Sequence, residues 1–117
     1  MIVEVPLHLS RLTGAPGAAE LHAALAGAYE GEQFVQVASA AECAELQTSR
    51  AGAAGYVAEL DPEALNGTNR MRLFVFANEE VGQARLVALL DNLGKGASGA
   101  AVQNLNLMLG LDEAEGL

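Results

Sequence analysis

Cysteine and basic residues are scarce in this sequence, and each shortage excludes a class of protein. The single cysteine, Cys43, has no partner for a disulfide within the chain, which agrees with a cytoplasmic location. Six lysine and arginine residues stand against fifteen acidic ones, and the formal net charge is -9 at pH 7. Because no basic stripe is present to neutralise a phosphate backbone, we expect no nucleic acid among the partners.

Long apolar runs and metal-ligand spacings are also missing. Glycine, asparagine or a charged residue interrupts each apolar stretch well before the roughly 20 residues needed to cross a bilayer. A strand-like pattern follows Met1 directly, where a targeting segment would carry basic residues. We therefore expect neither a membrane span nor an export signal. His8, His22 and Cys43 share no ligand spacing, so we expect no metal site.

The sequence does contain enough apolar material for one core. Hydrophobic residues make up 51% of the 117 residues, which excludes a disordered chain. This length fits a single domain and is too short for a Rossmann unit together with a substrate domain. We therefore treat residues 1–117 as one domain.

The N-terminal half predicts a strand, a helix, a second strand and a second helix. The hydrophobic periods place these elements, in order, at residues 2–9, 17–30, 34–37 and 39–46. Pro6 in the first strand indicates a sheet edge or a strand end. Gly31 is the expected cap of the first helix, and Ser39 with Glu42 forms a capping box for the second. The alanine- and glycine-rich residues 48–55 are expected to form a flexible surface insertion.

The C-terminal half predicts a short turn, a hairpin and a helix. The turn or short helix falls at residues 61–66, the strands at 71–77 and 84–90 with a polar tip between them, and the helix at 98–109, closed by Gly110. Both hairpin strands are apolar on both faces, so we expect a sheet that is covered on both sides by helices or by a partner. The order of elements predicts the α+β class with a mixed or antiparallel sheet.

Three polar features near the last helix each have two interpretations. The segment Gly94-Lys95-Gly96-Ala97-Ser98-Gly99 is either a solvated loop or a helix start whose N–H groups, dipole and lysine face a phosphate. Asn92 is either an ordinary turn residue or a ligand contact. Arg70 and Arg72 are either outward arginines at the entrance to the hairpin or, for Arg70, a guanidinium paired with a carboxylate or phosphate.

Three sequence blocks carry a family resemblance. They are VPLHL at residues 5–9, LDPEALNGTNR at 60–70 and LDNLGKGASGAAVQNLNLMLG at 90–110. In this order they resemble the C-terminal portion of the shorter, type 2 form of the N-acetyl-gamma-glutamyl-phosphate reductases. Residues 42–56 are the part least similar to that family.

The resemblance implies a fold, a reaction and a set of contacts. The fold would be that of the C-terminal domain of the glyceraldehyde-3-phosphate dehydrogenase-like superfamily. The reaction would be the NADP-dependent reduction of N-acetyl-gamma-glutamyl phosphate to N-acetylglutamate semialdehyde in arginine biosynthesis. The chain would provide the interface of a homo-oligomer, a dimer or tetramer. The implied cofactor contacts are Asn92, Lys95, Gly96, Ala97 and Ser98, which would face solvent in this chain alone, and the implied substrate contact is Arg70.

The sequence departs from the family in its catalytic and nucleotide-binding motifs. The family nucleophile lies in a Pro-Gly-Cys-Tyr context and its histidine in a His-Lys-His-like context, and neither occurs around Cys43, His8 or His22. A Gly-x-Gly-x-x-Gly motif after an early strand is missing too, so we expect that the Rossmann domain is absent and that this fragment alone is inactive. An alternative is a self-contained, non-catalytic α+β module that dimerises and binds an anion. An apolar stripe over residues 102–109 predicts self-association where it is exposed.

Overall fold

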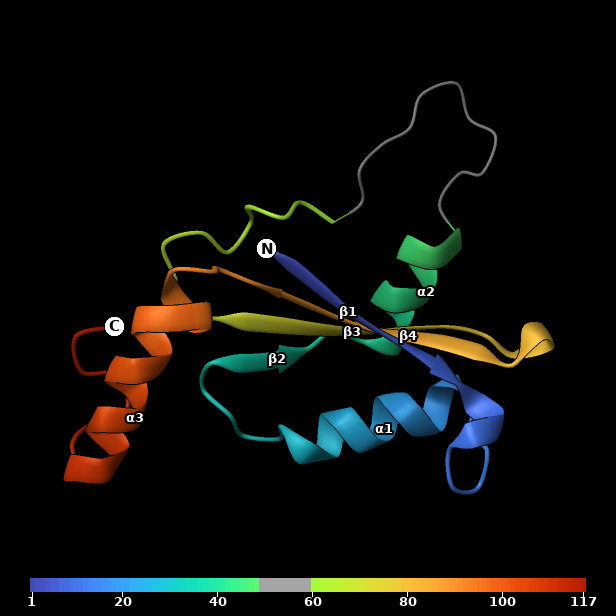
Figure 1. The fold of residues 1–117 in the computed structure, drawn as a ribbon, viewed down its shortest axis with the longest axis horizontal. Helices are drawn as coiled ribbons and strands as arrows, with labels where there is room; N and C mark the ends of the chain where they lie inside the picture. The colour runs from blue at the N-terminus through green and yellow to red at the C-terminus, as the bar shows by residue number, and fades with distance from the viewer. Residues whose placement is uncertain (49–59) are drawn as a thin grey trace.

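The computed structural model describes residues 1–48 and 60–117, so most of the insertion predicted at 48–55 lies outside the described residues. The strands and longer helices are, in order, β1 (Ile2–His8), α1 (Ala18–Ala28), β2 (Val35–Val37), α2 (Ala40–Thr48), β3 (Met71–Asn78), β4 (Gln83–Leu90) and α3 (Gly99–Leu109) (Figure 1). Short helical turns lie at Leu9–Arg11, Glu79–Val81 and Gly94–Ser98. Each predicted strand and helix is therefore found, with ends that differ by a few residues.

The four strands form one mixed sheet in the order β1-β4-β3-β2. β4 pairs antiparallel with both β1 and β3, whereas β2 runs parallel to β3. The predicted hairpin is confirmed, and its strands β3 and β4 form the centre of the sheet. The α+β class and the mixed sheet are confirmed, and both are consistent with the implied superfamily.

The hydrophobic core lies between the sheet and α2. Phe74 on β3 is only 1% exposed and clusters with Val87 and Leu89 of β4 and with Cys43 of α2. Neighbouring side chains of a strand point to opposite faces, so Val75 lies on the opposite face of β3 from Phe74. Helix α1 lies on the other side of the sheet from α2 (Figure 1). The two helices cover β3 from both sides, and this explains why its sequence is apolar on both faces.

Arg72 does not point outward, and that interpretation of it is wrong. Its guanidinium donates to both carboxylate oxygens of Glu42 at 2.8 Å and lies 5.1 Å from the centre of the Phe74 ring. Arg72 and Phe74 lie on the same face of β3, where α2 brings Glu42 over the strand. Since the carboxylate of Glu42 is engaged with Arg72, only half of the predicted capping box forms, through the Glu42 N–H and Ser39 Oγ at 3.1 Å.

The two edges of the sheet are protected in different ways. Met1 and Leu90 exchange hydrogen bonds, so alternate residues of β1, including Pro6, direct their backbone toward the free edge. Proline has no N–H to offer there, which confirms the edge position predicted for Pro6. On the opposite side, Gln47 of α2 binds both backbone groups of Ala77, where β3 extends beyond β2.

The predicted cap at Gly31 is wrong. Helix α1 ends at Ala28 and its C-cap is Tyr29, whose N–H donates to the Leu25 carbonyl, whereas Gly31 lies two residues beyond the cap with a φ of 82°. In the described ranges, no helix is long and apolar enough to span a membrane, and no group of three or more histidine, cysteine or acidic side chains is arranged to hold a metal ion.

We expect Phe74→Ala to lower the free energy of unfolding by about 3–5 kcal/mol, because it removes the most deeply buried ring of the core. Urea denaturation followed by circular dichroism measures this change. Val81→Ala is the control, because Val81 lies at the hairpin tip and is 61% exposed. A loss below about 1 kcal/mol for Phe74→Ala would show that the core is not centred on this ring.

Candidate functional site

The glycine-rich segment is a helical turn that joins β4 to α3. Gly94–Ser98 forms a π-helix, with hydrogen bonds from Gly96 N to Asp91 O at 2.8 Å and from Ser98 N to Leu93 O at 3.0 Å. Helical structure therefore begins four residues before the predicted start at residue 98. Single π-turns inside longer helices are frequent at functional sites.

Asp91 holds this turn against the rest of the chain. Its carboxylate accepts hydrogen bonds from the backbone N–H groups of Leu93 at 3.0 Å and Gly67 at 2.9 Å. These hydrogen bonds lower the pKa of Asp91 below its ordinary value of 3.8, because they stabilise the ionised carboxylate. The Asp91 carboxylate therefore occupies the Leu93 N–H, and that group is not available to bind an external anion.

Two of the glycines allow a close approach between this turn and the segment that precedes β3. A Cβ atom at Gly94 would overlap the carbonyl oxygen of Thr68, and one at Gly99 would overlap the side-chain oxygen of Asn69. A Cβ at Gly96 would lie 3.2 Å from the Asp91 carbonyl oxygen, a tighter contact than most. The glycines thus serve packing within the chain.

Lys95 is expected to face solvent in this chain alone, but it is half-buried. Its ammonium donates to Gln103 Oε1 at 2.6 Å and lies 5.6 Å from the centre of the Phe34 ring. Within residues 1–48 and 60–117, no carboxylate lies close enough to form an ion pair with it. The positive charge is therefore held in place by an amide and a ring, and it is not neutralised.

Gln103 connects Lys95 to two other segments, and sequence reasoning missed it. Asn69 Nδ2 also donates to Gln103 Oε1, at 2.9 Å, and Gln103 Nε2 donates to Glu113 Oε1 at 2.5 Å. Gln103 follows Lys95 by eight residues, about two helical turns, and this spacing is a signal that could have found it. Asn69 and Glu113 are joined to the network only by tertiary contacts.

The remaining predicted cofactor contacts are exposed. No hydrogen bond holds the Asn92 side chain among the described residues, so its amide is available to a ligand. Gly96 and Ala97 are exposed, and Ser98 Oγ donates to the Leu93 carbonyl at 2.8 Å. The fold brings Lys95 together with Asn69, and it leaves Asn92, Ala97 and Ser98 on the surface of the same turn.

Arg70 is exposed, and its guanidinium forms no ion pair within the described part of the chain. It directly follows Asn69, and its backbone N–H donates to Thr68 Oγ1 at 3.3 Å. The structure therefore places Arg70 next to the segment that contacts the glycine-rich turn and leaves its side chain free.

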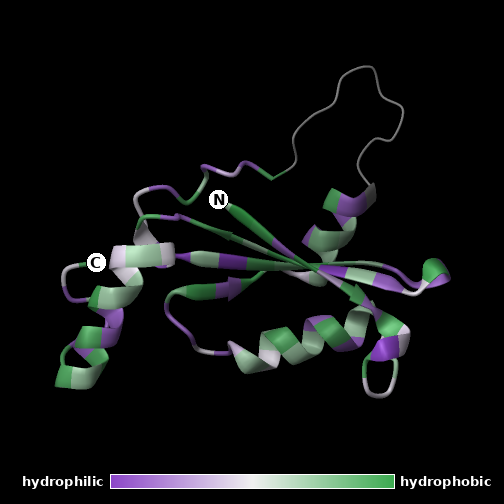
Figure 2. Ribbon diagram, in the orientation of Figure 1, coloured by the Kyte–Doolittle hydropathy of each residue, from purple (hydrophilic) through white to green (hydrophobic). Residues whose placement is uncertain are grey.

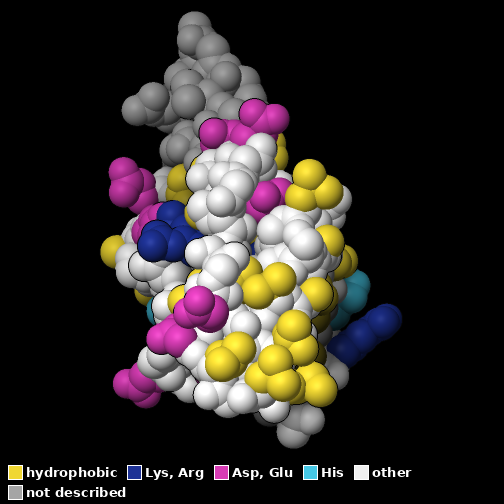
Figure 3. All heavy atoms as spheres, turned by 90° about the vertical axis from the view of Figure 1, so that its left-hand side faces the viewer, with side chains coloured by type: hydrophobic (Ala, Val, Ile, Leu, Met, Phe, Trp, Pro, Cys, Tyr) yellow, Lys and Arg dark blue, Asp and Glu magenta, His cyan; other side chains and the backbone are white. Residues whose placement is uncertain are grey.

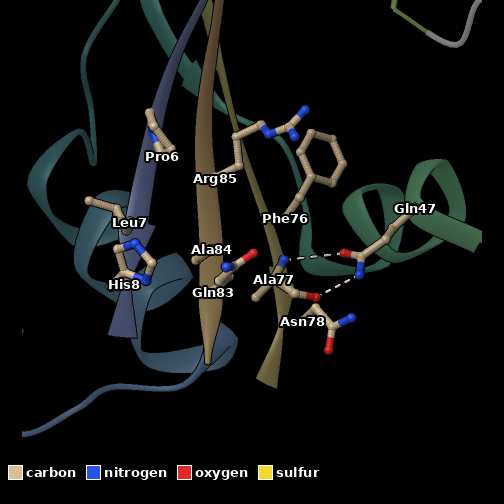
Figure 4. Close-up of a pocket in the computed structure, with 10 residues that line it drawn as sticks. All are labelled: Pro6, Leu7, His8, Gln47, Phe76, Ala77, Asn78, Gln83, Ala84 and Arg85. Atoms are coloured by element: carbon tan, nitrogen blue, oxygen red, sulfur yellow. Dashed lines mark hydrogen bonds between the residues drawn. The ribbon is translucent and has the colours of Figure 1, made fainter. Parts of the chain in front are cut away.

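A cavity of about 440 Å³ lies at the opposite end of the sheet, near the hairpin tip (Figure 4). Its lining residues are Pro6, Leu7, His8, Gln47, Phe76, Ala77, Asn78, Gln83, Ala84 and Arg85. β4 begins at this cavity and ends beside Asp91, so its eight residues separate the two places by about 23 Å. No predicted contact residue lines the cavity.

We expect Asp91→Asn to lower the thermal midpoint at about pH 6, because a neutral amide accepts more weakly than a carboxylate. A lowered folded pKa stabilises the fold fully above 3.8, and this contribution is lost as the pH falls through the folded value. Thermal unfolding of both proteins from about pH 6 to about pH 2.5 should therefore show two midpoints that converge in acid. Glu80→Gln, an exposed change at the hairpin tip, is the control, and a constant gap for Asp91→Asn would contradict the assignment.

The chain matches no protein-family model, but it is similar to curated proteins. It is 52% identical over 117 residues, its whole length, to the N-acetyl-gamma-glutamyl-phosphate reductase of Trichormus variabilis. It is 53% identical over 110 residues, 94% of its length, to the protein of the same name from Brucella ovis. The chain spans 34% and 32% of these two relatives, about a third of their length. The resemblance carried by the three sequence blocks is thus confirmed, and the chain is a homologue of the C-terminal portion of the N-acetyl-gamma-glutamyl-phosphate reductases.

Proposed function

We propose that this chain is the C-terminal part of an NADP-dependent N-acetyl-gamma-glutamyl-phosphate reductase of arginine biosynthesis, located in the cytoplasm. The intact enzyme would reduce N-acetyl-gamma-glutamyl phosphate to N-acetylglutamate semialdehyde and release phosphate. The observation that carries this proposal is the 52% identity to a protein of that name over the whole chain.

The groups on the glycine-rich turn fit a contact with the cofactor. A bound nicotinamide cofactor would supply the hydride, and the free amide of Asn92 suits its carboxamide. Since Asp91 already occupies the Leu93 N–H, the ammonium of Lys95 is the better contact for a cofactor phosphate or an acyl phosphate. The exposed residues Gly96, Ala97 and Ser98 would complete this surface, with Arg70 binding a carboxylate or phosphate of the substrate.

The proposal assigns the covalent chemistry to the rest of the enzyme. Cys43 is buried in the core between α2 and the sheet, where a thiol cannot reach an acyl phosphate. His22 Nε2 is bound to the Ala38 carbonyl oxygen at 2.7 Å, which gives this histidine a structural role. The chain alone would therefore reduce no acyl phosphate.

Helix α3 offers a surface for the rest of the enzyme. It lies at one end of the sheet and carries many apolar residues (Figure 2). Hydrophobic side chains gather on that side of the molecule, and Met108 is 83% exposed (Figure 3). About two thirds of the length of the relatives lies outside this chain, so we assign this surface to the nucleotide-binding domain.

The face of the sheet that carries Val3 and Val5 would form the interface between two copies. Both valines are exposed, Val5 to 50%, and their neighbours in register are Ala88 and Leu86 of β4. Helix α1 packs on β3 and leaves this part of the face uncovered. Two copies that join these faces about a two-fold axis would bury both apolar strips.

We expect Lys95→Ala in the intact reductase to weaken binding of NADPH or the acyl phosphate by about one to two orders of magnitude. The fold should survive, because the half-buried side chain contributes only one hydrogen bond and one ring contact. Lys95→Arg should be tolerated only in part, because a broad guanidinium would crowd the space between Gln103 and Phe34. Fluorescence titration with NADPH measures the change, with the distant Arg85→Ala as control. Unchanged binding for Lys95→Ala would remove Lys95 from the site.

We expect this chain to form at least a dimer at a protein concentration on the order of tens of micromolar. Val5→Lys should weaken the dimer by at least about tenfold, because it would desolvate an unpaired ammonium in the interface. Light scattering gives the mass of both proteins, and Val81→Lys at the exposed hairpin tip is the matched control. A monomeric parent chain, or an unaffected dimer of Val5→Lys, would contradict this interface.

A further inference from the structure

We infer that Gln103 is a positioning residue that holds the Lys95 ammonium ready for an anionic ligand, and that Glu113 sets the orientation of the Gln103 amide. This inference rests on the proposed function, in which Lys95 is the anion contact of the glycine-rich turn. It adds two residues, one from α3 and one from the segment that follows α3, to the machinery of that site.

The orientation of the Gln103 amide is determined by Lys95 and Glu113. The Lys95 ammonium can only donate and lies at one end of the amide together with Asn69 Nδ2, whereas the Glu113 carboxylate can only accept and lies at the other. The opposite orientation would face the ammonium with a donor group and the carboxylate with an oxygen. Gln103 Oε1 is therefore directed at Lys95 by donor and acceptor chemistry alone.

A neutral acceptor suits this role better than a carboxylate. A lysine has a flexible four-carbon stem, so an unattached ammonium would lose much of its freedom when a ligand binds. The hydrogen bond to Gln103 and the contact with Phe34 restrict the stem before binding. Because an amide carries no net charge, the attraction of Lys95 for an anion is preserved. The Glu113 carboxylate polarises the amide and strengthens its oxygen as an acceptor.

Glu113 is itself fixed by a buried side chain. Asn106 of α3 lies in the interior, and its Nδ2 donates to the carbonyl oxygens of Glu113 at 3.2 Å and Glu115 at 2.8 Å. Gly110 reverses the chain after α3 with a φ of 69°, a conformation that glycine adopts without strain. The chain after α3 thus folds back along the helix and presents Glu113 to Gln103.

Binding of NADPH to the intact reductase tests this inference. Gln103→Met keeps the length of the side chain and removes its hydrogen bonds. We expect it to raise the Kd and the KM for NADPH about three- to tenfold, which corresponds to losing the hydrogen bond that holds Lys95. We expect it to leave kcat within about twofold. Gln36→Met, an exposed change on β2, is the matched control and should alter none of these values. Glu113→Ala should weaken binding as Gln103→Met does, and Glu113→Gln, which retains an acceptor, should restore most of it.

A double-mutant cycle with Lys95→Ala separates positioning from a general structural effect. If Gln103 acts through Lys95, Gln103→Met has no further effect on the Kd when Lys95 is already alanine. Additive losses, or a loss of kcat together with the affinity, would overturn the inference. A weakened Lys95→Ala with unaffected Gln103→Met would overturn the role of Gln103 and leave the proposed function intact. An unaffected Lys95→Ala would instead overturn the anion contact of the proposed function, and this inference with it.

Discussion

The close contact between the Thr68–Asn69 segment and the start of the last helix sets the position of the glycine-rich turn and of the proposed cofactor contacts on it. The absence of a Cβ at Gly94 and Gly99 allows that contact, and the hydrogen bond from the Gly67 N–H to the Asp91 carboxylate holds it. Since the π-turn lies at this junction, its place relative to the sheet is fixed from both sides. A side chain at either glycine would push α3 away from β3 and move Lys95 with it.

The hydrogen bonds beside the same turn explain how a strongly acidic chain keeps the charge of Lys95 available. The sequence contains fifteen acidic and six basic residues. Arg72 is paired with Glu42, and Arg85 is paired with Glu4. Lys95 is held instead by a neutral amide, whose orientation is set by a carboxylate one residue further along the network. Gln103 lies between Glu113 and the Lys95 ammonium. Because the two charges are kept apart in this way, the carboxylate does not neutralise the charge of Lys95.

Apolar surfaces remain exposed on both the sheet and the last helix of this chain. Its tight core lies on one side of the sheet, against α2, while α1 covers only part of the other side. The strip around Val5 and the outer face of α3 remain in water. In the proposed assembly, a second copy and the rest of a longer protein would cover these surfaces and remove the free-energy cost of exposing them to water.

Local patterns in the sequence determined the order of strands and helices along the chain, the hairpin, the edge position of Pro6 and the family, because each depends on neighbouring residues or on a contiguous run. Only the tertiary structure decided which segments meet. Arg72 is drawn inward because α2 brings Glu42 over its strand. Gln103 and Glu113 become partners of Lys95 because the chain turns back at Gly110. The glycines at 94–99 resemble a phosphate-binding turn in sequence, yet Gly94 and Gly99 allow close contacts within the chain, with the Thr68 backbone and the Asn69 side chain. Such contacts join residues far apart in sequence, where periodicity and spacing carry no information.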